Sequence, residues 1–166
     1  TFYFDQIRRL MPDIRKATLA YNVFHEVGHH VQNLRVGDPI ETTKRLGVPM
    51  GLVVIALELQ ADCIAGMLAN IAHRVRPLFD KGDKENIMTS AESLGDDMVA
   101  MKLHGTFDPL LMTHGTGAMR RTAVSLGLGL VTLKQVPPVE WFVKYALQAT
   151  KTEPADWRRW QDVSPR

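Results

Sequence analysis

Apolar residues recur at three- and four-residue steps along most of the chain, and this spacing predicts a mainly helical fold. The first such run follows Pro12, a residue suited to the first turn of a helix, and it ends at Gly37-Asp38-Pro39. It predicts a helix over residues 12–35. The apolar positions of this helix are Ala17, Ala20, Phe24, Val27, Val31 and Leu34.

A second helix is predicted over residues 50–73, after a loop rich in Thr, Gly and Pro, and it is apolar on nearly every face. A helix that is hydrophobic all round lies in the middle of a domain, so each of its polar residues needs its own explanation. Gly28 in the first helix and Gly66 in the second indicate close approach of another backbone. The polar residues of the second helix are Glu58, Gln60, Asp62 and Asn70.

Three further helices are predicted towards the C-terminus. The charged, turn-rich segment 79–85 indicates a surface loop, and helices are expected after it over 86–103 and 116–128. A last helix is expected to begin after Pro137-Pro138. The aromatic run 2–4 indicates the end of a strand whose beginning lies upstream. The expected fold class is therefore mainly α, with at most a short β-strand at the N-terminus.

Length and composition are typical of one folded domain over residues 1–166, in which 150–166 form a terminal helix or tail. Apolar residues make up 45% of the chain and charged residues 23%, which excludes a disordered chain or a fibrous repeat. The single cysteine, Cys63, excludes an internal disulfide and is expected in the core. Because the chain begins at Thr1 rather than Met, we expect upstream residues to be missing, with any targeting signal among them.

Charge and hydropathy exclude two kinds of partner. Twenty basic and eighteen acidic side chains leave a net charge of +2 without a clustered basic face in the first 130 residues, so no nucleic-acid partner is expected. The C-terminal stretch is mildly basic and is interpreted as a solvated helix or tail. The longest apolar run, 48–57, is shorter than the roughly 20 residues that cross a bilayer, so no membrane span is expected in this chain.

The first predicted helix contains His25-Glu26-Val27-Gly28-His29, which has the HExxH pattern. Histidines four residues apart lie on one helix face, so both imidazoles can reach one tetrahedral Zn²⁺. Glu26 lies one step round the helix, where it can contact a metal-activated water without ligating the metal. The spacing therefore predicts a zinc site. The alternative is a chance match in which the two histidines form only a polar edge of the helix.

Two carboxylates four residues apart, Glu58 and Asp62, lie within the apolar second helix. Burying an unpaired carboxylate costs several kcal/mol, so both need cations or hydrogen-bond donors. A zinc ion held by the two histidines would take Glu58 as its third ligand and leave the fourth position for water. Asp62 is placed to accept the other ring N–H of a ligand histidine. The alternative is a salt bridge from either carboxylate to an arginine such as Arg74 or Arg120.

These motifs resemble those of the bacterial neutral zinc metallopeptidase family, over about residues 4–129. The resemblance implies a single zincin-like helical domain with a gluzincin-like site, in which His25, His29 and Glu58 hold Zn²⁺ and Glu26 is the general base. It also implies an upstream edge strand and a membrane-spanning N-terminus, and hence a membrane-associated bacterial enzyme. The matching segments are His25 to Gln32, Leu57 to Gly66, Gly95-Asp96-Asp97, Thr113-His114-Gly115-Thr116 and Arg120.

Two of these segments also carry candidate polar groups outside the zinc motif. By the resemblance, His114 matches a position that faces the cleft and donates to the oxyanion of the attacked carbonyl. The alternative is a loop histidine that caps the helix expected over 116–128. Asp96 and Asp97 are either acceptors near the site or a solvated helix face, and the solvated face is the favoured interpretation.

The leading hypothesis from the sequence is a zinc-dependent endopeptidase that acts on peptide or protein substrates, with Glu26 and His114 as catalytic residues. A second hypothesis is a catalytically inactive, zinc-stabilised binding module that keeps the site. A third is a metal-free helical interaction protein in which the same histidines and carboxylates form a buried polar network.

Overall fold

The computed structural model describes residues 16–35, 38–80 and 82–151, and in these ranges the chain forms seven α-helices, two short 3-10 helices and no strand. The prediction of a mainly α fold is thereby confirmed. The expected strand over 2–4, the start of the first predicted helix and the tail beyond 151 lie outside the described residues. The elements are α2 (Lys16–Arg35), α3 (Pro39–Leu46), α4 (Met50–Val75), α5 (Asp83–Ser93), α6 (Asp96–His104), η1 (Pro109–Leu111), α7 (Gly117–Leu128), η2 (Leu133–Gln135) and α8 (Val139–Thr150).

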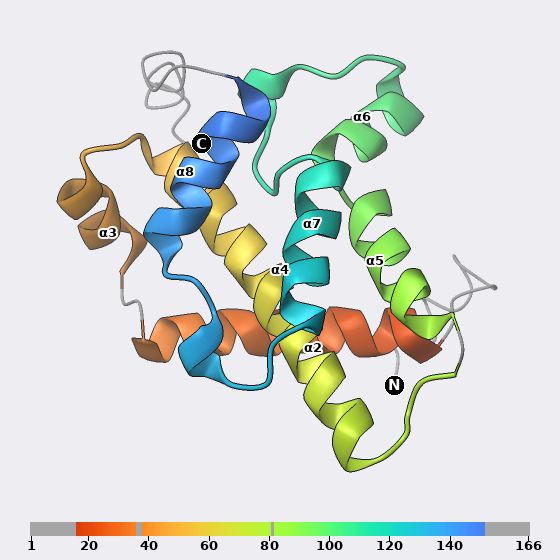
Figure 1. The fold of residues 1–166 in the computed structure, drawn as a ribbon. Coiled ribbons are helices and arrows are strands. Elements are labelled where there is room, and N and C mark those ends of the chain that lie inside the picture. Colours follow the sequence, from red (N-terminus) through yellow and green to blue (C-terminus); the bar gives the residue numbers. More distant parts are fainter. Residues whose placement is uncertain (1–15, 36–37, 81, 152–166) are drawn as a thin grey trace.

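Helix α4 runs through the middle of the molecule and contacts α2, α3, α7 and α8 (Figure 1). Leu52, Ile55 and Leu59 on this helix are fully buried. By length and composition α4 could cross a membrane, but 78% of its most apolar 18-residue window is buried inside the protein. That burial is the setting of a core helix, as the all-round apolar pattern predicts. Cys63 is fully buried in the same core, as expected.

Glycines let α4 approach α7 and α2 closely. A Cβ on Gly66 would lie 2.3 Å from the carbonyl oxygen of Val124, and one on Gly127 would lie 1.9 Å from that of Cys63. On α2, a Cβ on Gly28 would lie 2.9 Å from the carbonyl oxygen of Ala61. The expected backbone approach at Gly28 and Gly66 is confirmed, and it holds the HExxH segment directly against α4.

The prediction of a loop between the first two helices is wrong, because residues 39–46 form α3. Its Pro and Gly residues stand at the helix ends, and its two threonines lie inside the helix: Pro39 occupies the first turn, and Asp38 accepts a hydrogen bond from the backbone N–H of Ile40 at 2.8 Å. Gly47 ends the helix with a φ of 64°, a left-handed conformation that favours glycine.

The prediction of a single helix over 86–103 is also wrong, because the helix is interrupted between α5 and α6. The backbone N–H of Gly95 bonds to the carbonyl oxygen of Glu92, and the next N–H, that of Asp96, turns to the carbonyl oxygen of Gly115 at 2.9 Å. A Cβ on Gly95 would lie only 2.0 Å from the backbone nitrogen of Gly117. The break therefore brings the start of α6 against the start of α7, beside the candidate site.

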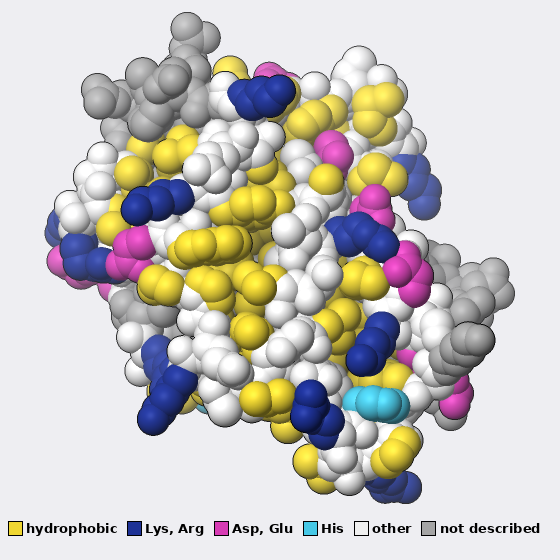
Figure 2. All heavy atoms as spheres, in the orientation of Figure 1, with side chains coloured by type: hydrophobic (Ala, Val, Ile, Leu, Met, Phe, Trp, Pro, Cys, Tyr) yellow, Lys and Arg dark blue, Asp and Glu magenta, His cyan; other side chains and the backbone are white. Residues whose placement is uncertain are grey.

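On the face drawn in Figure 2, lysine and arginine side chains are scattered among acidic ones and are not gathered into one patch. Hydrophobic side chains collect on this face over the region between α7 and α8. This face therefore offers no continuous basic stripe of the kind that follows a nucleic-acid backbone.

Candidate metal centre and catalytic cleft

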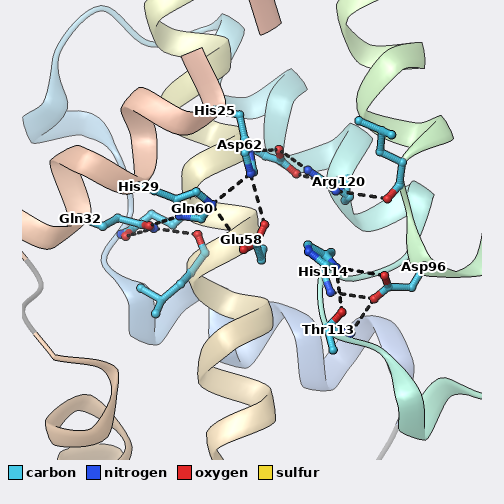
Figure 3. A network of polar contacts seen from close by, with 12 residues as sticks. His25, His29, Gln32, Glu58, Gln60, Asp62, Asp96, Thr113, His114 and Arg120 are labelled. Atoms are coloured by element: carbon cyan, nitrogen blue, oxygen red, sulfur yellow. Dashed lines mark hydrogen bonds and ion pairs between the residues drawn. The ribbon is translucent and has the colours of Figure 1, made fainter. Parts of the chain in front are cut away.

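The crossing of α2 and α4 brings His25, His29 and Glu58 together (Figure 3). The Nε2 atoms of His25 and His29 lie 3.1 Å apart. Oε2 of Glu58 is 3.3 Å from Nε2 of His25, and Oε1 is 3.3 Å from Nε2 of His29. One donor atom from each residue lies within 4.8 Å of the other two. Two imidazole nitrogens and one carboxylate oxygen thus surround a common point, as in three-ligand zinc sites with an open fourth position.

The donor atoms themselves fit a cation at this point. Oε2 of Glu58 is buried and accepts no hydrogen bond from any described residue. A buried carboxylate oxygen without a partner is unfavourable, and a bound cation would remove that penalty. The nitrogen and oxygen donors present are those that Zn²⁺ takes in proteins.

The charges around the cluster also favour a positive centre. Burial pushes the pKa of His25 down, but the nearby carboxylates of Asp62 and Glu58 outweigh it and raise that pKa to about 9. Glu58 raises the pKa of His29 as well. Burial would raise the pKa of Glu58, yet the two histidines hold it far below its usual range. The carboxylate therefore stays ionised and faces both rings.

Asp62 makes both of the contacts that the sequence analysis gives as alternatives, one to a candidate ligand histidine and one to an arginine. Its Oδ1 lies 2.8 Å from Nδ1 of His25, and because a carboxylate only accepts, the ring nitrogen donates. Its Oδ2 also accepts from Nε of Arg120 at 2.9 Å. The hydroxyl of Tyr21 donates to Oδ1 at 2.6 Å. The side chain of Asp62 is fully buried, so these donors replace the water it has lost.

A cleft of about 860 Å³ opens beside the metal cluster. Helices α2, α5, α6 and α7 and the loop before α7 form its walls, and its polar lining includes His25, Glu26, His114 and Arg120. Glu26 is exposed and lies one residue after His25, so its carboxylate is accessible to a molecule in the cleft. The apolar lining comprises Leu19, Val23, Val27, Leu94 and Val99.

His114 lies on the cleft wall and is held by Asp96 (Figure 3). The backbone N–H of His114 donates to Oδ2 of Asp96 at 2.7 Å, and its Nδ1 lies 3.2 Å from Oδ1. The hydrogen bond to Asp96 raises the pKa of His114 against partial burial. The interpretation of His114 as a helix cap is wrong, because the hydroxyl of Thr116 caps α7 by accepting from the N–H of Met119 at 3.3 Å.

Asp96 and Asp97 do not form the solvated helix face favoured from the sequence. Asp96 also accepts from the backbone N–H of Thr113 at 2.6 Å, and Asp97 accepts from that of Gly117 at 2.7 Å. The two carboxylates therefore bind the loop that carries His114. The favoured interpretation fails because hydrophobic periodicity cannot show which backbone N–H groups a loop brings close.

Two polar residues of the site have no role in the sequence-based prediction. Tyr21 precedes His25 by four residues and contacts the same Asp62 carboxylate. Gln32 follows His29 by three residues, and its Oε1 lies 2.9 Å from Nδ1 of His29. Both spacings place a residue on the same helix face as a histidine, and that signal is available from the sequence.

The family model described as "Putative neutral zinc metallopeptidase" matches residues 1–134. The chain belongs to this family. The matched part of the chain includes all residues of the candidate centre and of the cleft. The zinc expected from the motifs agrees with the metal in the family's name.

The curated proteins that are similar to this chain are longer than it is. The uncharacterized protein YpfJ of Escherichia coli K12 is 32% identical over 123 residues, which cover 72% of this chain and 42% of that protein. The uncharacterized protein Rv2575 of Mycobacterium tuberculosis H37Rv is 34% identical over 122 residues, which cover 64% of this chain and 39% of that protein. The chain thus spans about two fifths of the length of these relatives. No solved structure matches it.

Proposed function

We propose that this protein is a zinc-dependent endopeptidase. The observation that carries the proposal is the convergence of His25, His29 and Glu58 within 4.8 Å of one another, beside a cleft that Glu26 lines. Membership of a family named for neutral zinc metallopeptidases supports the same chemistry. The cleft is open to solvent and large enough for a stretch of peptide.

In this proposal His25, His29 and Glu58 hold the zinc ion. Bound Zn²⁺ would polarise the scissile carbonyl and lower the pKa of water. Glu26 takes a proton from the attacking water and returns it to the leaving amine nitrogen. Its exposed position on the cleft wall, next to a candidate ligand in the sequence, suits that role. No covalent bond between enzyme and substrate is required.

His114 has a separate role in the proposed reaction. Asp96 engages its Nδ1, which leaves Nε2 as the ring atom available to a ligand in the cleft. The raised pKa of His114 keeps the ring protonated to higher pH, so Nε2–H can donate to the oxygen that becomes negative during attack. The negative charge of Glu58 also favours the protonated ring.

The cleft walls favour peptides that carry apolar side chains. Val23 and Val27 on α2 are 44% and 39% exposed, and Leu94 and Val99 across the cleft are 40% and 39% exposed. A substrate side chain between these walls would remove apolar surface from water, which stabilises binding by about 0.8 kcal/mol per buried CH₂ group. We therefore propose peptide or protein substrates with an apolar residue close to the scissile bond.

The test combines metal content with hydrolysis. Mass spectrometry of the acid-digested protein should find about one zinc per chain, and the protein should cleave an unfolded casein-like substrate. Glu26→Gln should retain the zinc and lose cleavage, because it removes only the proton acceptor.

Other outcomes contradict the proposal. Zinc without cleavage by the wild type would favour the inactive binding module. Absence of zinc even after incubation with excess Zn²⁺ would favour a metal-free polar network. Cleavage by Glu26→Gln at the wild-type rate would remove Glu26 from the mechanism.

A further inference from the structure

Two buried glutamines connect the candidate ligand His29 to the loop before α8. Gln32 and Gln60 lie beside His29 in Figure 3. Gln32 on α2 is 5% exposed and Gln60 on α4 is 6% exposed. Oε1 of Gln32 lies 2.9 Å from Nδ1 of His29, and Nε2 of Gln32 lies 2.7 Å from the carbonyl oxygen of Leu57 and 3.1 Å from Oε1 of Gln60. Nε2 of Gln60 lies 2.9 Å from the carbonyl oxygen of Pro137.

The two backbone carbonyls fix the direction of every bond in this chain of contacts. A carbonyl oxygen only accepts, so Pro137 requires the NH₂ group of Gln60 and leaves its Oε1 towards Gln32. The carbonyl of Leu57 and Oε1 of Gln60 both require the NH₂ group of Gln32. Oε1 of Gln32 then faces His29, so Nδ1 of His29 must carry the proton. A neutral ring protonated at Nδ1 has its lone pair on Nε2.

We propose that Gln32 and Gln60 are positioning residues that lock His29 in the tautomer able to bind a cation through Nε2. The proposal rests on the proposed metal site. Gln32 orients the ring of His29 as Asp62 orients the ring of His25, but it does so with a neutral amide. Asp62 has the guanidinium of Arg120 as its counter-charge, whereas the partners of Gln32 are neutral, so a neutral acceptor suits this position.

Gln60 favours a single orientation of the Gln32 amide. If the amide of Gln32 turned over, its NH₂ group would face Nδ1 of His29, and its oxygen would face the carbonyl oxygen of Leu57 and Oε1 of Gln60. That orientation is unfavourable, because it places acceptors against one another and removes the donor to Oε1 of Gln60. The turned amide would also favour a proton on Nε2, where it would block a cation. Gln32 and Gln60 thereby hold the ring of His29 in the tautomer that can bind a cation, before any metal is present.

The matched control is Asn70, a third amide on α4. It is 6% exposed, and its Nδ2 donates to the carbonyl oxygen of Leu130 at 2.9 Å. Like Gln60, it ties α4 to the segment between α7 and α8, but its hydrogen bond runs to Leu130 and not towards a histidine of the site. Loss of its hydrogen bond should therefore lower stability without changing the metal site.

The experiment measures the dissociation constant for Zn²⁺ by competition with a chelating dye. Gln32→Met should raise it about 10- to 100-fold, as loss of a ligand's hydrogen-bond partner does at other zinc sites. Gln60→Met should raise it less, because the carbonyl of Leu57 still orients Gln32. Asn70→Leu should leave it within about twofold of the wild type, whatever its melting temperature.

A second readout needs no metal, and its decisive part uses only the wild-type protein. In metal-free wild-type protein at a pH where the rings are neutral, ¹⁵N spectra of the histidines should place the proton of His29 on Nδ1. Gln32→Met should let the ring exchange between its two tautomers. A wild-type proton on Nε2 would overturn the inference.

The two proposals fail in different ways. Equal zinc affinity in wild type and Gln32→Met would overturn the role of Gln32 and leave the proposed peptidase intact. Absence of zinc binding by the wild type would overturn the proposed function itself.

Discussion

Oδ1 of Asp62 accepts a hydrogen bond from Nδ1 of His25 at 2.8 Å, and this contact joins a core ion pair to the candidate metal cluster. The same carboxylate binds Arg120, whose Nε lies 2.9 Å from Oδ2. One turn earlier on α4, Glu58 faces the Nε2 atoms of both candidate ligands. Two carboxylates four residues apart therefore make different contacts: Glu58 faces both candidate ligand rings, and Asp62 holds one of these rings and a guanidinium.

Asp62→Asn is expected to lower the free energy of unfolding by about 3 kcal/mol, because it leaves the guanidinium of Arg120 buried without a counter-charge. The measurement is urea unfolding in the presence of a chelator, so that zinc binding does not contribute. Glu41→Gln is the control, since it removes the same charge from an exposed pair, in which Nζ of Lys44 lies 2.8 Å from the Glu41 carboxylate. The control should change stability by less than about 0.5 kcal/mol. Equal effects of the two substitutions would contradict the prediction.

Glu58→Gln is expected to raise the dissociation constant for Zn²⁺ by about 100-fold or more, because it removes the anionic donor and loss of mere supporting contacts already costs 10- to 100-fold. The measurement is competition with a chelating dye. Glu140→Gln, which removes a surface carboxylate paired with Arg45, should leave the constant unchanged. Unchanged affinity in Glu58→Gln would exclude Glu58 as a ligand.

His114→Gln is expected to lower kcat by about 10²- to 10³-fold while zinc content stays at the wild-type value, because the substitution removes a donor to the developing oxyanion. The measurement pairs steady-state hydrolysis of a peptide with metal analysis of the same sample. His104→Gln is the control, since His104 is exposed in the last turn of α6. A wild-type kcat in His114→Gln would limit His114 to its structural contact with Asp96.

His114 is also expected to stabilise the fold more in mildly acidic than in alkaline solution. Its pKa is raised by Asp96 and Glu58, against partial burial and Arg120. A raised pKa adds stability below the unfolded value of about 6.5, and the contribution disappears as the pH rises through the folded value. Because the side chain is 50% exposed, water limits the effect to about 0.5 kcal/mol.

The check for this pH dependence is the difference in unfolding free energy between wild type and His114→Gln, measured at about pH 5.5 and about pH 9 in metal-free buffer. The pH-independent part of the substitution cancels between the two conditions. The difference should be larger at the lower pH, and equal differences would argue against the ion pair.

The helices and the zinc motif could be predicted from the sequence because both depend on spacing within one helix. The two histidines lie four residues apart on α2, and the two carboxylates lie four residues apart on α4, so each pair shares a face whatever the tertiary structure. The apolar character of α4 also predicts that its carboxylates need partners. The site then forms where α2 and α4 cross, provided that the histidine face of α2 contacts the carboxylate face of α4.

The long-range contacts that support the site could not be predicted, because they join residues far apart in the sequence. Asp96 binds the N–H of Thr113 across 17 positions, and Gln60 binds the carbonyl of Pro137 across 77 positions. Periodicity carries no information on either pair. Helix α3 was missed for a different reason: Pro and Gly mark helix ends as well as loops, and in a helix of only 8 residues these end residues dominate the pattern.

Gly66→Ala is expected to destabilise the protein by about 2 kcal/mol or more, although alanine is the better helix former by about 1 kcal/mol. Its Cβ would lie 2.3 Å from the carbonyl oxygen of Val124, a backbone atom that moves only if α4 and α7 separate. Gly129→Ala is the control: its φ is −87° and its nearest contact would be at 3.4 Å, so the change should be neutral or slightly stabilising. Thermal and urea unfolding measure both variants. Since α7 carries Arg120, separation of the two helices should also weaken the Arg120 contact with Asp62, and equal stability of the two variants would show that α7 can shift without cost.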